Sequence, residues 1–219
     1  MQNSFTPKNA STERPAKGRP RAFDREKALE KATLLFWRKG FSATSMSDLT
    51  AAMGIGSPSL YAAFGSKEAL YAETLRYYAE HCGPRVWAGF DSARTARDAV
   101  QAYLMDSAAA LTGANGPDDP PGCMLVLSAV GEEGHSALGI IVRDARAQVL
   151  LKLEARFSQA VSEGELDAAL NVNGLARYIL AVQGGMVLQS RDGASRTELE
   201  NIVQCALMGW DAQVRYGER

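Results

Sequence analysis

Three residues, Gly54-Ile55-Gly56, join two short segments with helical patterns, and this tight connection constrains the fold more than any other feature of the sequence. Upstream, Ser45 and Asp48 have the spacing of a capping box and predict a helix over 46–53. Downstream, a short helix is expected to begin near Ser57. A dinucleotide-binding glycine loop needs a buried strand before its first glycine, and a helical segment does not supply one. We therefore interpret the glycines as a turn between two helices.

Helices are also predicted on both sides of this pair. Asp24 can cap a helix that Gly40 ends, because apolar residues recur between them at helical spacing. A fourth helix is expected from about Ser66 to about Cys82, where Gly83-Pro84 should break it. Helices that reverse direction across three residues match a helix-turn-helix module, although any three-helix bundle with a tight turn has the same pattern.

The charge of the chain is unevenly distributed. Residues 1–67 contain eleven basic and five acidic residues, a net charge of +6, whereas the remainder carries −7 and the whole chain −1. A basic module before an acidic body is typical of a surface that binds phosphates, but a basic tail often serves only solubility. Charge alone therefore leaves both interpretations open.

Several sequence blocks in the basic module occur in a recognisable order. They are Gly18-Arg19-Pro20-Arg21, Ala32 through Phe36, Gly40-Phe41, Thr44 through Leu49, Met53-Gly54-Ile55, Leu60-Tyr61, Phe64 and Lys67-Glu68-Ala69-Leu70. With these blocks, residues 19 to about 75 resemble the DNA-binding domain of the TetR/AcrR family of bacterial transcriptional regulators. The resemblance implies an all-α protein with an N-terminal three-helix helix-turn-helix module and a C-terminal helical bundle for ligand binding and dimerisation. The expected division is a disordered basic arm (1–18), the DNA-binding domain (19–66) and the effector-binding and dimerisation domain (67–219).

The resemblance also implies a function. A protein of this kind is expected to bind a palindromic double-stranded DNA operator as a homodimer and to be released by a small-molecule effector of unknown identity, and repression is favoured over activation. The short helix after the turn would face the major groove, two residues at helix starts would bind phosphate, and the arm would contact the backbone or the minor groove. These roles fall in turn on Ser57, Pro58, Ser59 and Tyr61, on Thr44 and Lys67, and on Arg19 and Arg21. Packing of Tyr61 and simple solvation of the two arginines are the alternatives.

The last two predicted helices, over about 172–191 and 197–216, have wide apolar faces. The short junction at 191–194 makes them antiparallel neighbours. The resemblance implies that such a pair forms a four-helix dimer interface, here through Leu175, Ile179, Val182, Met186, Ile202, Ala206 and Trp210. The alternative is that both faces are buried within one subunit.

The acidic body contains enough aromatic and thioether side chains to line an apolar effector pocket, although most such side chains simply pack in a core. We expect the effector to lie among Trp87, Phe90, Tyr103 and Met124. The last of these belongs to a short apolar helix predicted over 123–130.

Other classes of function are disfavoured. The chain has two histidines and neither a Gly-x-Ser-x-Gly elbow nor a His-Glu-x-x-His helix, so no enzyme and no cofactor are expected. His81 and Cys82 have poor ligand spacing, so no metal site is expected. Apolar runs fall short of the roughly 18 residues of a membrane span, which predicts a cytoplasmic protein without a membrane partner. Two alternatives stay open: a thiol-based redox regulator that uses Cys123, and a DNA-binding scaffold without a ligand.

Overall fold

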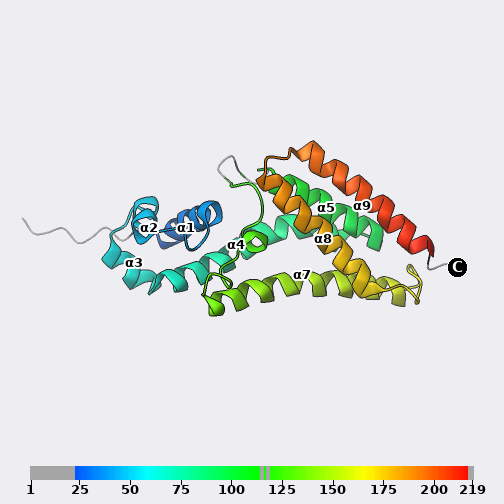
Figure 1. The fold of residues 1–219 in the computed structure, drawn as a ribbon. Helices are drawn as coiled ribbons and strands as arrows, with labels where there is room; N and C mark the ends of the chain where they lie inside the picture. Colours follow the sequence, from blue (N-terminus) through cyan, green and yellow to red (C-terminus); the bar gives the residue numbers. More distant parts are fainter. Residues whose placement is uncertain (1–22, 114–115, 117–118, 217–219) are drawn as a thin grey trace, which may run out of the picture.

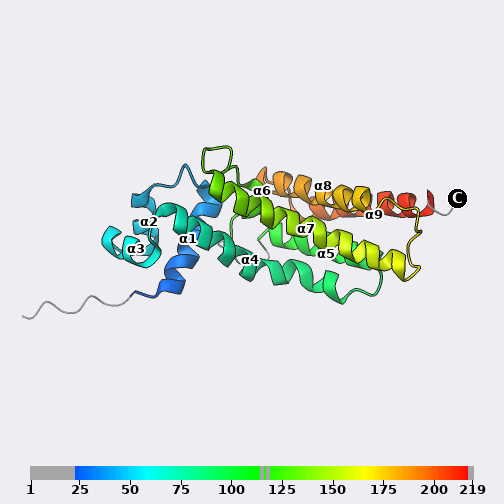
Figure 2. The same ribbon diagram turned by 90° about the horizontal axis from the view of Figure 1, so that it is seen from below.

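The computed structural model describes residues 23–113, 116 and 119–216, and all of the regular structure in these ranges is α-helical. The arm over 1–18 and both Arg19 and Arg21 lie outside the described residues. The helices are α1 (Arg25–Lys39), α2 (Met46–Met53), α3 (Ser57–Phe64), α4 (Lys67–Ser92), α5 (Ala96–Leu111), α6 (Met124–Leu127), α7 (Ser136–Ser162), α8 (Val172–Arg191) and α9 (Arg196–Tyr216). Figures 1 and 2 show an elongated molecule in which α1–α3 form one end and α4 leads from them into the body. The all-α prediction is confirmed.

The turn between α2 and α3 has the predicted form. The Ser45 side chain accepts a hydrogen bond from the Asp48 amide, and the Asp48 side chain accepts one from the Ser45 amide, which completes the capping box. Gly54 ends α2 in the left-handed conformation, with φ 71° and ψ 30°, where a residue with a side chain would be strained. Ile55 is half-buried against the core of α1–α3. The glycines are therefore helix punctuation and not a phosphate loop.

The fourth helix does not end near Cys82, as the sequence suggested, but continues through Pro84 to Ser92. Proline removes one backbone hydrogen bond from a helix. Packing beyond it compensates: the Trp87 ring stacks on Tyr103 of α5 at a centroid distance of 4.5 Å, and Phe90 is buried against the same helix. With 26 residues, α4 spans about 39 Å.

Helices α5 to α9 form the body (Figure 1). Their core includes an edge-to-face contact between Phe157 of α7 and Trp210 of α9, with centroids 5.0 Å apart. The short helix predicted over 123–130 is only one turn long, over Met124–Leu127. Arg146 of α7 explains its position, because its guanidinium donates hydrogen bonds to the carbonyls of Leu125, Val126 and Ser128.

Two apolar cores lie along the molecule and meet on α4. One joins α1–α3 to Leu70, Tyr71, Leu75 and Tyr78 in the first half of α4 and extends to α6 and α7. The other fills the body around α5, α8 and α9. The first half of α4 thus packs with α1–α3, although the domain division at residue 66 stays a prediction.

Candidate DNA-binding surface and effector cavity

Helix α3 presents its polar face to solvent. Leu60 and Phe64 are buried against α1, α2 and α4, whereas Ser57, Pro58 and Ser59 are exposed. Tyr61 is also exposed, with 49% of its surface accessible, although it is a large side chain that a core could have taken. The four residues predicted to meet the major groove are therefore all accessible from solvent.

Thr44 does not reach this surface. It is fully buried, and its hydroxyl donates a hydrogen bond to the Gly40 carbonyl at 2.7 Å. The sequence predicted a phosphate contact here through amides at the helix N-terminus, but Thr44 precedes the capping residue Ser45 and its amide donates a hydrogen bond to the Phe41 carbonyl at 3.2 Å. Ser47, in the first turn of α2, is exposed and offers a hydroxyl that the sequence pattern did not single out.

Lys67, the first residue of α4, is half-buried beside α1–α3. Its Nζ lies 4.2 Å from the centroid of the Phe41 ring, which holds the ammonium in place by a cation–π contact. Within the described ranges Lys67 has no acidic partner, whereas Lys39 pairs with Asp48 at 3.2 Å and Arg25 with Glu73 at 2.8 Å. Lys67 is therefore the better-placed cation for an external phosphate.

Most residues predicted for the dimer interface are buried inside one subunit. The side chains of five of them fill the core of the body, so they cannot face a second copy: Leu175, Ile179, Met186, Ala206 and Trp210. Val182 and Ile202 are half-buried and pack against the same core. The residues predicted for the dimer interface thus lie on the faces of α8 and α9 that point into the body.

Exposed apolar side chains also occur on α8 and α9. Leu188, Met208 and Tyr178 are 56%, 64% and 36% exposed. The Tyr178 hydroxyl donates to the Ala206 carbonyl at 3.3 Å and so ties the two helices together. We call these three side chains the outer apolar face.

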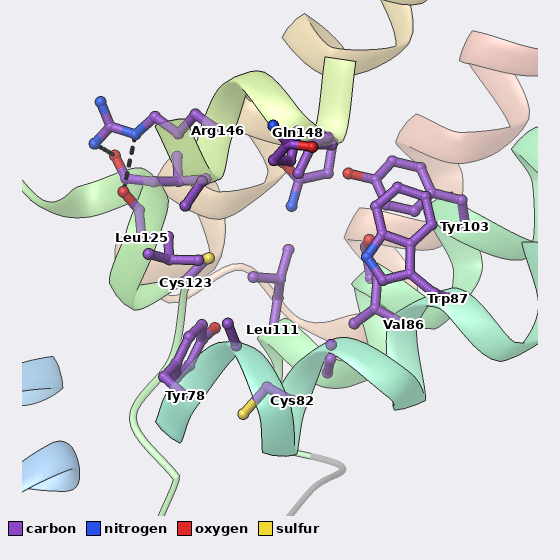
Figure 3. A pocket seen from close by; sticks show the side chains of 18 of the residues that line it. Tyr78, Cys82, Val86, Trp87, Tyr103, Leu111, Cys123, Leu125, Arg146 and Gln148 are labelled. Atoms are coloured by element: carbon purple, nitrogen blue, oxygen red, sulfur yellow. Dashed lines mark hydrogen bonds between the residues drawn. The ribbon is translucent and has the colours of Figure 1, made fainter. Parts of the chain in front are cut away.

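A cavity of about 390 Å³ lies between the end of α1, the middle of α4 and the body. Figure 3 shows Cys82 and Val86 of α4 along one side, Trp87 and Tyr103 at one end, and Cys123 and Leu125 at the other. Helices α1, α5, α7 and α8 also contribute to the wall, through Trp37, Ser107, Ala110, Leu111, Ala145, Arg146, Gln148, Val149, Lys152, Leu180 and Gln183. The remaining lining residues are Tyr78, Ala79, Gly83, Gly122 and Val126. Such a volume falls in the range of small-molecule sites.

Two of the four predicted pocket residues line this cavity. Trp87 and Tyr103 form its aromatic end, with ring planes inclined by 19°. Phe90 and Met124 are instead buried in the cores and do not line it, which corrects the prediction for both. Sequence reasoning missed Trp37, which brings α1 into the wall, because its spacing in α1 marks only a core position.

The charged groups in the wall already have partners. Arg146 points away from the cavity toward the carbonyls of α6 (Figure 3). Lys152 forms an ion pair with Asp91 at 2.7 Å and lies over the Trp87 ring. Because no acidic residue among those that the structure describes lines the cavity, its charges do not favour a cationic ligand.

Burial also suppresses ionisation in the wall. Desolvation raises the pKa of the Cys82 thiol to about 11, and the nearby Asp119 and Cys123 act in the same direction. Burial likewise raises the pKa of Tyr78 well above its usual value, with a further contribution from Cys123. At neutral pH both groups are uncharged.

Known proteins resemble this chain in sequence. A family model described as bacterial regulatory proteins, tetR family, matches residues 28–74. The HTH-type transcriptional repressor ComR of Escherichia coli (strain K12) is 30% identical over 202 residues, which cover 91% of this chain and 95% of that repressor. The chain belongs to the TetR family. A second repressor of that organism, BdcR, is 51% identical over 61 residues, 28% of this chain.

Solved structures of TetR-family proteins share the whole fold. A cysteine-substituted form of the TetR family transcriptional regulator CifR, complexed with 26-bp double-strand operator DNA, is 35% identical and has a TM-score of 0.82, covering 88% of this chain and all of that chain. This TetR-family chain is thus a transcriptional regulator in fold and sequence. None of its described helices is long and apolar enough to cross a membrane.

Proposed function

We propose that this TetR-family chain is a repressor that binds a palindromic operator as a homodimer and releases it when an uncharged small molecule enters the cavity. One observation carries the proposal: α4 begins with Lys67 beside α3 and then lines the cavity through Tyr78, Cys82 and Trp87. A single helix therefore joins the DNA-binding surface to the cavity.

The operator contacts follow from the exposed face of α3. Hydroxyls of Ser57, Ser59 and Tyr61 can donate to or accept from base edges and phosphates, and Pro58 can contact a thymine methyl. Lys67 supplies a phosphate contact. At the start of α2, the phosphate contact is assigned to Ser47 and no longer to Thr44. Arg19 and Arg21 are proposed as arm contacts on the basis of sequence alone.

Dimerisation is proposed through the outer apolar face of α8 and α9, in place of the buried residues that the sequence suggested. Exposed apolar side chains that gather on one face are typical of interaction sites. A symmetric dimer would place two α3 helices about one turn of DNA apart, roughly 34 Å, which suits a palindrome.

The cavity connects to the DNA-binding domain by two routes. The first is α4, because a small tilt of a rigid helix moves the helices packed on its far end. The second is α1: Trp37 is a wall residue, and its backbone carbonyl accepts a hydrogen bond from Arg191 of α8 at 3.4 Å. Arg191 also donates to the Arg38 carbonyl at 2.7 Å, so the end of α1 is fixed to the body. A ligand in the cavity therefore contacts both domains.

The coupling can be tested once a ligand is found. A compound collection is screened by thermal shift, since a bound compound raises Tm, and each positive compound is titrated with and without an operator obtained by in vitro selection. The operator should weaken compound binding by the same factor by which the compound weakens operator binding. Equal compound affinity in both titrations contradicts the coupling, and DNA binding with no positive compound favours the ligand-free scaffold.

A pair of variants locates the site. Ala145→Trp on α7 fills the cavity and should abolish the effect of the compound while operator binding persists. Ala147→Trp, at an exposed position of the same helix, is the matched control and should change neither. Retention of the full effect in Ala145→Trp would place the effector elsewhere.

A thiol-based response is a second candidate, because Cys82 and Cys123 both line the cavity. The raised pKa of Cys82 leaves Cys123 as the candidate nucleophile. Mass spectrometry after mild peroxide treatment, with Cys123→Ser as control, tests it. Peroxide that releases the operator from both forms equally would exclude Cys123.

A further inference from the structure

Gln183 of α8 is the unusual residue in the cavity wall. It is 8% exposed, yet it lines the cavity among mostly apolar side chains. Within the part of the chain that the structure describes, its amide makes no hydrogen bond. A buried amide normally pairs with other protein groups, because leaving its donors and acceptor unpaired is costly.

The side-chain amide of Gln183 also remains accessible from the cavity. Among the described residues, the unpartnered side-chain polar atoms without accessible surface belong to Trp37, Ser107 and Arg156, and neither amide atom of Gln183 is among them. Because Gln183 is almost fully shielded from the outside, the surface that its amide retains is available to a molecule inside the cavity. An amide offers two donors and one acceptor there.

The remaining wall restricts what such a molecule can be. Arg146 is engaged by three backbone carbonyls, and Lys152 is paired with Asp91. The aromatic end formed by Trp87 and Tyr103 favours a flat apolar group. Among the uncharged polar groups that line the cavity, Gln183 is the buried side-chain amide, and it is therefore suited to orient a ligand.

We propose that the effector is an uncharged, mostly apolar molecule with a carbonyl group, and that Gln183 anchors this carbonyl by donating a hydrogen bond from its amide nitrogen. This inference rests on the proposed effector function and specifies its ligand class. A ligand of equal shape without the carbonyl displaces water from the amide but accepts no hydrogen bond in its place, so it binds more weakly.

Two probe molecules of matched shape test the anchor. In 2-acetylnaphthalene the carbonyl oxygen takes the place of the terminal CH2 group of 2-isopropenylnaphthalene, so the two differ mainly in their ability to accept a hydrogen bond. Isothermal titration calorimetry on the full chain should show that the ketone binds about tenfold more tightly than the alkene, the order expected for pairing a buried amide.

Variants assign this preference to one residue. Gln183→Met has a similar length and no amide, so it should reduce the preference to less than about twofold while leaving alkene affinity equal or improved. Gln148→Met, at an exposed wall position, should keep the wild-type preference. Equal binding of the two probes to the wild type, no binding of either probe, or an unchanged preference in Gln183→Met would each overturn the anchor.

A separate readout distinguishes the anchor from the switch. Fluorescence anisotropy of a labelled operator is recorded with and without 2-acetylnaphthalene at a saturating concentration. Preferential binding of the ketone without release of DNA would support the Gln183 anchor and contradict the proposed effector function. Release of DNA by both probes at equal affinity would support the function and refute the anchor.

Discussion

Replacing Lys67 with alanine should make operator binding less sensitive to salt. Its Nζ lies 4.2 Å from the Phe41 ring centroid and has no acidic partner among the described residues, so its charge is available to a phosphate. Each phosphate contact contributes about 0.9 to the slope of log affinity against log salt concentration. In the proposed dimer, Lys67→Ala removes two contacts and should flatten the slope by about 1.8.

This slope corresponds to a measurable difference in affinity. Between 50 and 200 mM salt, wild-type affinity should fall about twelvefold more than that of Lys67→Ala, a ratio that follows from a slope difference of about 1.8. Loss of the cation–π contact should destabilise the domain by only about 0.5–1 kcal/mol, so the variant stays folded. Circular dichroism melting confirms this before binding is measured.

Fluorescence anisotropy across a salt series provides the assay. Lys152→Ala is the matched control, because Lys152 lies on α7 in the body and pairs with Asp91 near the C-terminal end of α4. Its slope should equal that of the wild type. A wild-type slope in folded Lys67→Ala would show that Lys67 does not contact phosphate.

Three further predictions concern the dimer, a thiol and a carboxyl group. Leu188→Glu places a charge in the proposed interface, so light scattering should show a monomer. The control Leu151→Glu, on α7 and 53% exposed, should remain a dimer. A dimer in both variants would show that the interface lies elsewhere. Iodoacetamide should label the exposed Cys205 before Cys82. The Cys82 pKa of about 11 leaves only about one molecule in a thousand as the reactive thiolate at pH 8. Equal labelling rates would contradict the burial of Cys82. Hydrogen bonds from the Ser45 amide and hydroxyl, with a contribution from Lys39, lower the pKa of Asp48 to about 2. The capping box should therefore persist above pH 4 and weaken as the pH falls through 2. An NMR titration midpoint near 3.8 for the Asp48 carboxyl would refute this.

The DNA-binding module could be predicted closely because local rules determine it. The capping box at Ser45 and Asp48 and the left-handed Gly54 set helix ends without help from distant residues. Pro84 shows the limit of such rules: it marks a helix end locally, but the contacts of Trp87 and Phe90 with α5 outweigh one lost hydrogen bond. Those contacts depend on a helix that follows in the chain.

The errors at the candidate site have a related cause. Helix α8 contains both the buried Ile179 and the exposed Leu188, and the apolar pattern of the sequence alone does not separate the two. Phe90 is in the core while Trp87, three residues earlier, lines the cavity, and only the arrangement of helices decides between them. Gln183 was not chosen because a single glutamine in an apolar helix becomes informative only when its surroundings are known.

The most direct test of the account is the contribution of α3 to operator recognition. A palindromic operator is selected in vitro with the wild-type protein. Fluorescence anisotropy then measures how tightly the wild type and the double variant Ser59→Ala/Tyr61→Ala bind this operator and a scrambled duplex of equal length. The quantity compared is the ratio of operator affinity to scrambled-duplex affinity. Both side chains are exposed, so the double variant should fold normally. The account predicts that the affinity ratio falls at least about tenfold, because each lost base contact is worth about 1–3 kcal/mol. An unchanged ratio in a folded double variant would contradict the claim that this face of α3 reads the operator.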